Sequence, residues 1–192
     1  MHVLMIIFRV FLSFLTVFLI VGCSSKPVAT AKYHSHFDFG NIESYSLYDR
    51  NSKFSEFQNI SDATRNSIEL AIEQAIEHLG YQYQNPQQAD IVIGYHLINS
   101  AKELKKYNKG VKFCGPCLRE GLASADKRSW QMLPGSLILD VVDRHNNRSI
   151  WRSVYPLKIK DNDNSFEVQD KIFAAISAMV NTIPNKLITH RT

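Results

Sequence analysis

The segment from residue 90 to residue 98 constrains the fold of this chain more than any other. It reads Asp-Ile-Val-Ile-Gly-Tyr-His-Leu-Ile, a run of branched and aromatic side chains without regular polar alternation. Because a strand with one wet face alternates apolar and polar residues, this run predicts a strand that is covered on both faces. Gly94 inside the run marks a bulge or a close approach to the backbone. The domain is therefore expected to be built around a sheet that contains this strand.

Two segments carry apolar stripes at the helical period. One helix is expected to begin after a cap at Ser61 or Asp62 and to end at Gly80, where a left-handed residue is favourable. The other is expected over residues 165–182, and Pro184 ends it. The first stripe consists of Ile68, Ile72, Ala75, Ile76 and Leu79, and the second of Val168, Ile172, Phe173, Ile176, Met179 and Val180.

Further strands are expected around these helices. Residues 33–49 alternate roughly and predict two strand segments with a break at residues 40–41. Residues 136–143 and 149–159 predict a hairpin, joined by an asparagine-containing turn. The side chains expected to share a face are Leu137, Leu139 and Val141 on the first strand, and Ile150, Arg152 and Val154 on the second, with Trp151 on the opposite face.

The order of elements is therefore strand, helix, strand, hairpin, helix. It predicts an α+β fold, a mixed β-sheet with both helices packed on one face. We expect residues 33–192 to form one domain of this kind, with a long loop over residues 99–134 that shows no clear periodicity. The positive charge excess of the chain is concentrated in that loop, in Lys102, Lys105, Lys106, Lys109, Lys112, Arg119, Lys127 and Arg128.

The first 22 residues are typical of a cleaved bacterial lipoprotein signal. Arg9 precedes an apolar stretch over residues 10–21, and the tetrapeptide that ends in Cys23 resembles a lipobox. Cleavage before Cys23 and acylation of the protein at this residue would leave a lipidated tether over residues 23–32. An uncleaved transmembrane anchor is the alternative, but the apolar run after Arg9 is shorter than the roughly 20 residues that span a bilayer.

The residue that follows Cys23 indicates which membrane would hold the lipoprotein. It is Ser24, not the aspartate that commonly retains lipoproteins at the inner membrane. We therefore expect a lipid-anchored protein of the bacterial cell envelope, at the outer membrane and facing the periplasm. With a formal net charge of +4, the chain is not predicted to bind nucleic acid.

Cys114 and Cys117 frame the sequence Cys-Gly-Pro-Cys. In an oxidising compartment the two cysteines are expected to form a disulfide. The same four residues form the active site of thioredoxin-like oxidoreductases, in which a helix begins at the first cysteine and lowers its pKa. No apolar strand precedes Cys114, so we favour a local clip, with redox exchange and unpaired thiols as the alternatives.

Other candidate motifs lack partners that their chemistry needs. His34 and His36 share a strand face but have no third metal ligand nearby. Residues 161–165 begin like a calcium loop but lack its glycine and its final acid, so they are expected to cap the last helix. Asp140 and Asp143 are three residues apart on a strand and so face opposite ways. We predict no catalytic residue, no metal and no cofactor.

Several segments together resemble a known bacterial family. They are Phe37-Asp38-Phe39 with Tyr45, Leu79-Gly80-Tyr81, residues 89–95, residues 135–143 and Ile150-Trp151-Arg152. In this order and spacing they resemble the lipoproteins built on domain of unknown function 4136. The resemblance implies an exported, membrane-tethered α+β domain without an assigned activity. The basic segment with its two cysteines departs from that pattern.

These features predict a non-enzymatic envelope lipoprotein that binds another envelope component. The expected surface is the basic loop, clipped by Cys114 and Cys117, and the expected partner is an anionic lipid, a lipopolysaccharide phosphate or an acidic protein patch. A solvated loop that contacts nothing is the alternative for that surface. Two further hypotheses are a periplasmic thiol–disulfide exchanger, with Cys114 as nucleophile and Cys117 as resolver, and a purely structural tethered domain.

Overall fold

A computed structural model of the chain describes residues 27–50, 60–120, 132–160 and 162–184. The expected signal over residues 1–22, Cys23, Lys127 and Arg128 lie outside these residues. Within the described part of the chain, no helix is both long and apolar enough to cross a bilayer.

Seven strands form one mixed sheet in the order β3-β2-β4-β6-β7-β1-β5. β2 is parallel to β3 and β4, and the other neighbouring strands are antiparallel. β4 is an interior strand and pairs with β6 along its whole length, as the apolar run predicts. The strands are β1 (Thr30–Tyr33), β2 (Ser44–Leu47), β3 (Gln82–Tyr83), β4 (Ile91–Leu97), β5 (Arg119–Glu120), β6 (Ser136–Asp143) and β7 (Arg148–Pro156).

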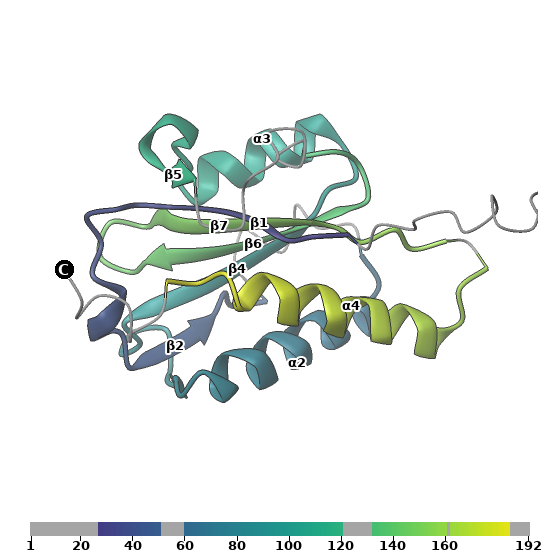
Figure 1. Cartoon of the computed structure of the whole chain (residues 1–192), viewed down its shortest axis with the longest axis horizontal. Helices are drawn as coiled ribbons and strands as arrows, with labels where there is room; N and C mark the ends of the chain where they lie inside the picture. The colour runs from purple at the N-terminus through teal and green to yellow at the C-terminus, as the bar shows by residue number, and fades with distance from the viewer. Residues whose placement is uncertain (1–26, 51–59, 121–131, 161, 185–192) are drawn as a thin grey trace, which may run out of the picture.

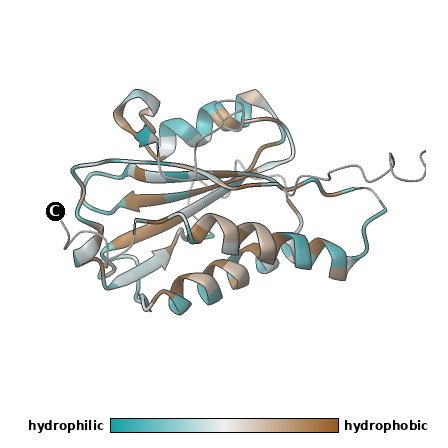
Figure 2. Cartoon of the chain, in the orientation of Figure 1, coloured by the Kyte–Doolittle hydropathy of each residue, from teal (hydrophilic) through white to brown (hydrophobic). Residues whose placement is uncertain are grey.

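Three α-helices of the described residues cover this sheet. α2 (Asp62–His78) and α4 (Ser165–Val180) lie on one face, and α3 (Ala101–Gly110) lies on the other (Figure 1). The larger core is enclosed by α2, α4 and the sheet, and a smaller core lies beneath α3. In Figure 2 the hydrophobic colour follows the strands and α4, whereas much of α3 is hydrophilic. The predicted α+β class and mixed sheet are confirmed.

The ends of α2 and α4 follow from local sequence. The Ser61 side chain accepts a hydrogen bond from the backbone N–H of Thr64, and Gly80, directly after the C-cap, has a φ of +89°. At the start of α4, Asn164 and Glu167 form a capping box. The polar turn before α4 therefore caps the helix, as its composition predicts.

The expected loop over residues 99–134 is wrong in its first part, because α3 lies there. Ser100 caps the helix, and Leu104, Tyr107 and Val111 pack onto the sheet. Only these three apolar positions mark the helical period among the lysines, which is too weak a stripe to recognise in sequence. α3 supplies the second cover that the apolar run of β4 requires.

The predicted face of Ile150 is also wrong. Val141 of β6 pairs with Trp151 and Val142 pairs with Ser149, so Ile150 is the extra residue of a β-bulge. Ile150 therefore joins Trp151 in the larger core, whereas Val154 lies in the smaller one. One inserted residue shifts the alternation of the faces, and a sequence pattern does not reveal the insertion.

The domain begins before residue 33. β1 starts at Thr30, and Ala29 and Ala31 are buried in the larger core. Residues 30–32 therefore belong to the sheet, and Ala29 belongs to the core and not to the tether.

Candidate functional site

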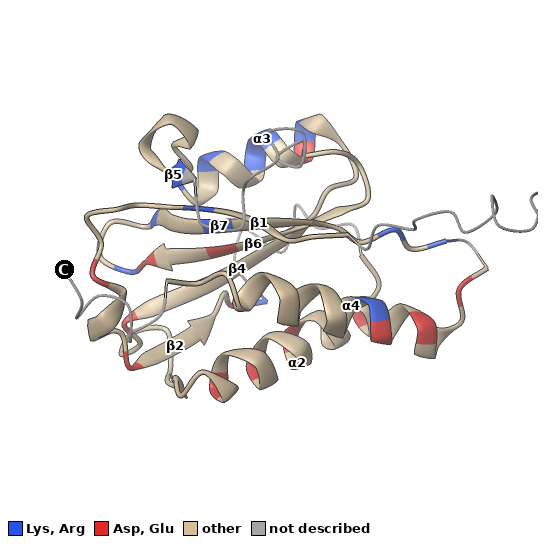
Figure 3. Ribbon diagram, in the orientation of Figure 1, with Lys and Arg blue, Asp and Glu red and all other residues tan. Residues whose placement is uncertain are grey.

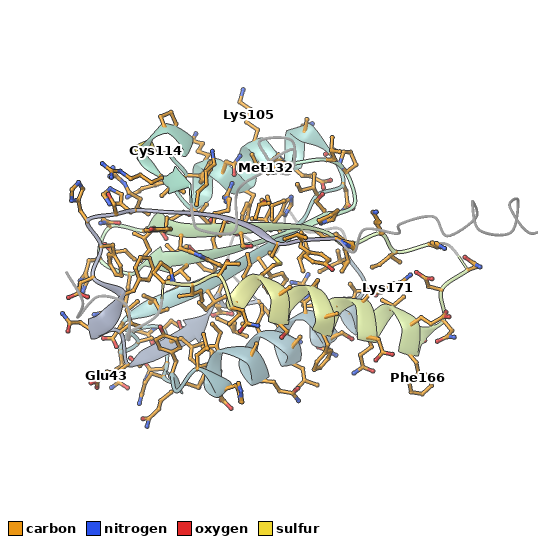
Figure 4. All side chains as sticks on the ribbon, in the orientation of Figure 1. Glu43, Lys105, Cys114, Met132, Phe166 and Lys171 are labelled. Carbon is orange, nitrogen blue, oxygen red and sulfur yellow. A yellow bond between two sulfur atoms is a disulfide. The ribbon has the colours of Figure 1, made fainter. Side chains whose placement is uncertain are left out.

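The outer face of α3 carries the densest cluster of predicted binding residues. Tyr107 anchors the inner face of the helix, and Leu104 lies beside it. Lysines at positions i, i+3, i+4 and i+7 share the outer face and are exposed. Figure 3 shows the basic residues along α3, and in Figure 4 Lys105 points away from the domain. We call this set the lysine face; it comprises Lys102, Lys105, Lys106 and Lys109.

The other predicted basic residues do not join the lysine face. Lys112 is exposed, but its Nζ donates to the backbone oxygen of Asn146 at 2.6 Å and so fastens the β6–β7 turn. Arg119 is exposed on the edge strand β5. Lys127 and Arg128 lie outside the described residues. The structure therefore gathers half of the predicted set on one helical face.

The opposite side of the molecule carries charge of the other sign. Figure 3 shows basic residues along α3 and acidic residues along α2, which lie on opposite faces of the sheet. On α2 these acids are Asp62, Glu69, Glu73 and Glu77. No acidic helix of the described residues therefore lies beside the lysine face. Glu103, which belongs to α3 itself, is half-buried at the edge of the lysine face.

Beneath the lysine face lies a fully buried ion pair between Asp140 of β6 and Arg152 of β7. Arg152 Nε donates to Asp140 Oδ1 at 2.8 Å, and Nη2 donates to Oδ2 at 2.9 Å. Both side chains have no exposed surface. The two residues are direct cross-strand partners, so the sheet register itself sets this two-pronged geometry.

Further hydrogen bonds to the pair come from its surroundings. Tyr107 Oη donates to Asp140 Oδ2 at 2.8 Å, and Ser149 Oγ donates to Oδ1 at 2.5 Å. Arg152 Nη1 donates to Asn108 Oδ1 at 2.7 Å. The Arg152 guanidinium also lies 3.6 Å from the ring centre of Phe113. Since Tyr107, Asn108 and Phe113 come from α3 and its exit, the ion pair holds that layer on the sheet.

His96 of β4 completes the buried layer. Its ring stacks on Tyr107 with 4.8 Å between ring centres, and neither of its nitrogens has a hydrogen-bond partner. Burial, together with the nearby Arg152 cation, lowers the pKa of His96 to about 4, although Asp140 acts in the opposite direction. His96 is therefore neutral near pH 7.

Gly94 makes the close approach that the sequence predicts. A Cβ atom at this position would lie 2.8 Å from Cε2 of Tyr48 and 3.0 Å from the Tyr107 hydroxyl. Gly94 faces Asp140 across the sheet, so the missing side chain leaves the space through which Tyr107 reaches the carboxylate.

Sequence reasoning missed this buried network. Asp140 and Asp143 do face different environments, as expected, because Asp143 bonds to the turn residues His145 and Asn146. The signal that was available is the occurrence of His96, Asp140 and Arg152 in otherwise apolar strands. All polar atoms of Asp140 are satisfied internally and none is exposed, so the network positions α3 and does not meet a substrate.

Cys114 and Cys117 form the predicted disulfide, with 5.2 Å between their Cα atoms. The residues from Gly115 to Cys117 form a single 3-10 turn, so no α-helix begins at Cys114. Closing so short a ring contributes at most about 2 kcal/mol in loop entropy. The clip lies directly after Phe113, whose ring contacts the Arg152 guanidinium, and Cys114 is labelled in Figure 4.

Two other clusters are less suited to chemistry. His34 and His36 lie with their ring centres 5.9 Å apart, and no group of three possible metal ligands occurs among the described residues. A depression of about 350 Å³ between β2, β3 and α2 is lined by Arg50, Glu69 and Tyr83, among others. In it, Glu69 accepts from Tyr95 Oη at 2.7 Å and from Arg50 Nε at 2.9 Å, so its carboxylate is already paired.

Comparison with known proteins places the whole domain. Residues 29–185 match the family model described as Domain of unknown function (DUF4136). A DUF4136 family protein from Bacteroides thetaiotaomicron shares the fold with a TM-score of 0.51 at 13% identity, over 80% of this chain and 96% of that one. No curated protein matches the sequence.

Two more distant structures were also found. A PDZ domain protein from Parabacteroides distasonis has a TM-score of 0.45 at 10% identity, covering 80% of this chain and 34% of that one. A PelC dodecamer from Paraburkholderia phytofirmans has a TM-score of 0.41 at 10% identity, covering 80% of this chain and 98% of that one.

Proposed function

This chain belongs to the DUF4136 family, whose function is unknown, and we propose that it is an envelope lipoprotein that binds an anionic envelope component through its lysine face. In this proposal the lipid on Cys23 holds the protein at the outer membrane, and the folded domain faces the periplasm. The domain acts by binding and carries out no catalysis.

The observation that carries the proposal is the position of four lysines on one exposed helical face. Lysines scattered around a helix are commonly a solvated surface, but Lys102, Lys105, Lys106 and Lys109 present their charges in one direction. The buried ion pair and Tyr107 hold the helix that bears them. A fixed array of cations suits phosphate groups or carboxylates, and each lysine near an anionic surface contributes about 1 kcal/mol.

A charge-reversal variant tests this binding. Replacement of the four lysines by glutamate is expected to weaken binding at least tenfold at low salt, because attraction becomes repulsion. Binding would be measured by sedimentation of the chain from Ser24 onward with phosphatidylcholine vesicles that contain one-third phosphatidylglycerol, with lipopolysaccharide micelles and with envelope fractions.

The matched control replaces the same four lysines by arginine. This variant keeps the charge and the helix propensity and is expected to bind like the natural sequence. Unchanged binding of the glutamate variant to all three probes would overturn the proposal. Binding of the natural chain to envelope fractions alone would point to an acidic protein as the partner.

Thiol–disulfide exchange is the second candidate, because the cysteine pair is formed and Cys117 is exposed. The single turn at Cys114 lacks the α-helix that stabilises a catalytic thiolate. We therefore expect a reduction potential below about −300 mV, as for structural disulfides, when the domain is equilibrated with glutathione or dithiothreitol buffers. A value between about −270 and −120 mV, the range of exchange catalysts, would instead support exchange.

A further inference from the structure

We infer that the end of the domain at which β1 begins is a membrane-contact surface, which places Phe166 and three other exposed apolar side chains of that end in the lipid headgroup region. This inference rests on the proposed lipid anchor at Cys23. It adds a second surface to the lysine face, with a bilayer as its partner. We call this surface the tether end; it comprises Val28, Leu133, Ile159 and Phe166.

The sheet register brings three of these residues to one end. Thr30 at the start of β1 pairs with Val154, and Ser136 at the start of β6 pairs with Pro156 at the end of β7. Beyond the strands, the backbone N–H of Leu157 donates to the oxygen of Gly135 at 3.2 Å. Val28, Leu133 and Ile159 extend from these three strand ends.

A polar turn fixes the start of α4 beside them. The backbone N–H of Lys160 donates to the Asp163 carboxylate, and the backbone N–H of Asp163 donates to the backbone oxygen of Lys160. The Lys171 ammonium pairs with the same carboxylate. Lys171 also reaches the backbone oxygen of Lys158 at 3.5 Å. In Figure 4, Phe166 points away from the body of the domain at the first turn of α4.

The exposure of apolar surface is uneven over the molecule. Six large hydrophobic side chains are exposed among the described residues, and four of them form the tether end. Their exposed fractions are 79% for Phe166, 63% for Val28, 56% for Leu133 and 40% for Ile159. Single exposed apolar residues are common, but a group at one end indicates an interaction surface.

The connection from β7 to α4 carries two cations that suit a lipid surface. Lys158 and Lys160 flank Ile159 in sequence and are exposed, whereas the exposed acids Glu167 and Asp170 follow Phe166 on α4. Lysine stems pack along apolar groups while their ammonium groups reach phosphate. Apolar side chains with lysines beside them, such as Ile159 between Lys158 and Lys160, are typical of proteins that lie in the membrane interface.

The tether length identifies the bilayer as the occupant. Val28 lies five positions after the lipidated Cys23, and the buried lead-in to β1 begins at the next residue, Ala29. A fully extended chain spans at most about 3.6 Å per residue, so Val28 stays within roughly 18 Å of the lipidated residue. A soluble partner would have to fit between the tether end and the bilayer, within that distance, whereas the lipid headgroups lie next to the lipidated residue itself.

Tryptophan fluorescence tests the inference on the lipidated full chain, reconstituted in vesicles of phosphatidylcholine with one-third phosphatidylglycerol. In a Phe166→Trp variant, the emission of the added tryptophan is expected to lie at shorter wavelength in vesicles than that of a tryptophan in water. Its intensity is expected to fall at least twofold when the lipids carry brominated acyl chains, which quench tryptophan emission. The unsubstituted lipidated chain supplies the background of the natural tryptophans.

Tyr83→Trp is the matched control, because Tyr83 is another exposed aromatic residue. Tyr83 pairs with Tyr45 of β2, and Tyr45 pairs in turn with Ile91 of β4. Ile91 pairs with Asp143 at the β6–β7 turn, so Tyr83 lies at the end of the sheet opposite the tether end. Its added emission is expected to be insensitive to brominated lipids.

The outcomes separate this inference from the proposed anchor. Co-flotation of the full chain with vesicles while emission at position 166 stays unquenched would overturn the inference and leave the anchor intact. A blue shift at position 166 without bromine quenching would overturn it in favour of a protein contact, such as a second copy. Equal quenching at positions 166 and 83 would overturn the predicted orientation. Failure of the full chain to float with vesicles would overturn the anchor itself.

Discussion

A variant in which Asp140 is replaced by alanine is expected to lose about 3–5 kcal/mol of unfolding free energy, measured by urea denaturation. The substitution leaves the Arg152 guanidinium without exposed surface and without its carboxylate. It also removes the acceptor of Tyr107 and Ser149. Since a domain is stable by about 5–15 kcal/mol, the variant retains only a fraction of its stability.

Asp143→Ala is the matched control for this experiment. It is the same substitution on the same strand, but Asp143 bonds only to exposed groups of the turn. A loss of about 1 kcal/mol or less is expected there. Equal losses in the two variants would contradict the role of the buried pair.

A second variant separates the ion pair from the packing around it. Joint replacement of Asp140 by leucine and Arg152 by methionine removes both charges and keeps apolar volume. Because no charge is then buried without a partner, the double variant is expected to be several kcal/mol more stable than Asp140→Ala. A double variant as unstable as the alanine variant would show that shape, and not charge, carries the effect.

His96 is expected to make the domain sensitive to acid. Its pKa in the folded state is lowered to about 4, against an ordinary value of 6.5. Well above pH 6.5 the His96 imidazole is neutral in both the folded and the unfolded state, so it causes no loss of stability there. Between pH 6.5 and about 4 the unfolded chain binds a proton that the folded chain does not, so stability falls with pH. The loss attributable to His96 approaches about 3 kcal/mol at pH 4.

The acid effect is measured as a difference between two proteins, since carboxylates also titrate in this range. The natural chain and a His96→Phe variant, which keeps a ring against Tyr107, would be unfolded in urea at several pH values. The variant is expected to lose less stability on acidification. His145→Phe, at an exposed turn position, controls for the loss of one imidazole. A variant with the same pH profile as the natural chain would contradict the prediction.

These two predictions concern the layer that bears the lysine face. Asp140 and Arg152 hold Tyr107 and Asn108, which belong to the same helix as the four lysines. Loss of the ion pair or protonation of His96 is therefore expected to loosen α3 before the larger core opens, because the smaller core beneath α3 contains fewer buried apolar residues than the larger one.

Elements with strong local signals were predicted correctly. The stripes of α2 and α4 span several turns, and their caps at Ser61 and Asn164 use side chains that bond within three residues. The apolar run of β4 predicted a strand covered on both faces, and its side chains pack into the larger and the smaller core. The cysteine pair is so close in sequence that its disulfide needed no knowledge of the fold.

The tertiary structure decided what covers the second face and what lies within it. The segment with three apolar residues among lysines is stable as α3 because Tyr107 donates a hydrogen bond to Asp140 and packs into the space above Gly94. The bulge at Ile150 and the pairing of Asp140 with Arg152 depend on the register between two strands. The sequence by itself determined the class of fold, because periodicity and capping act over a few neighbouring residues. Only the tertiary structure placed the buried ion pair and the tether end, because residues far apart in the chain meet there through strand register.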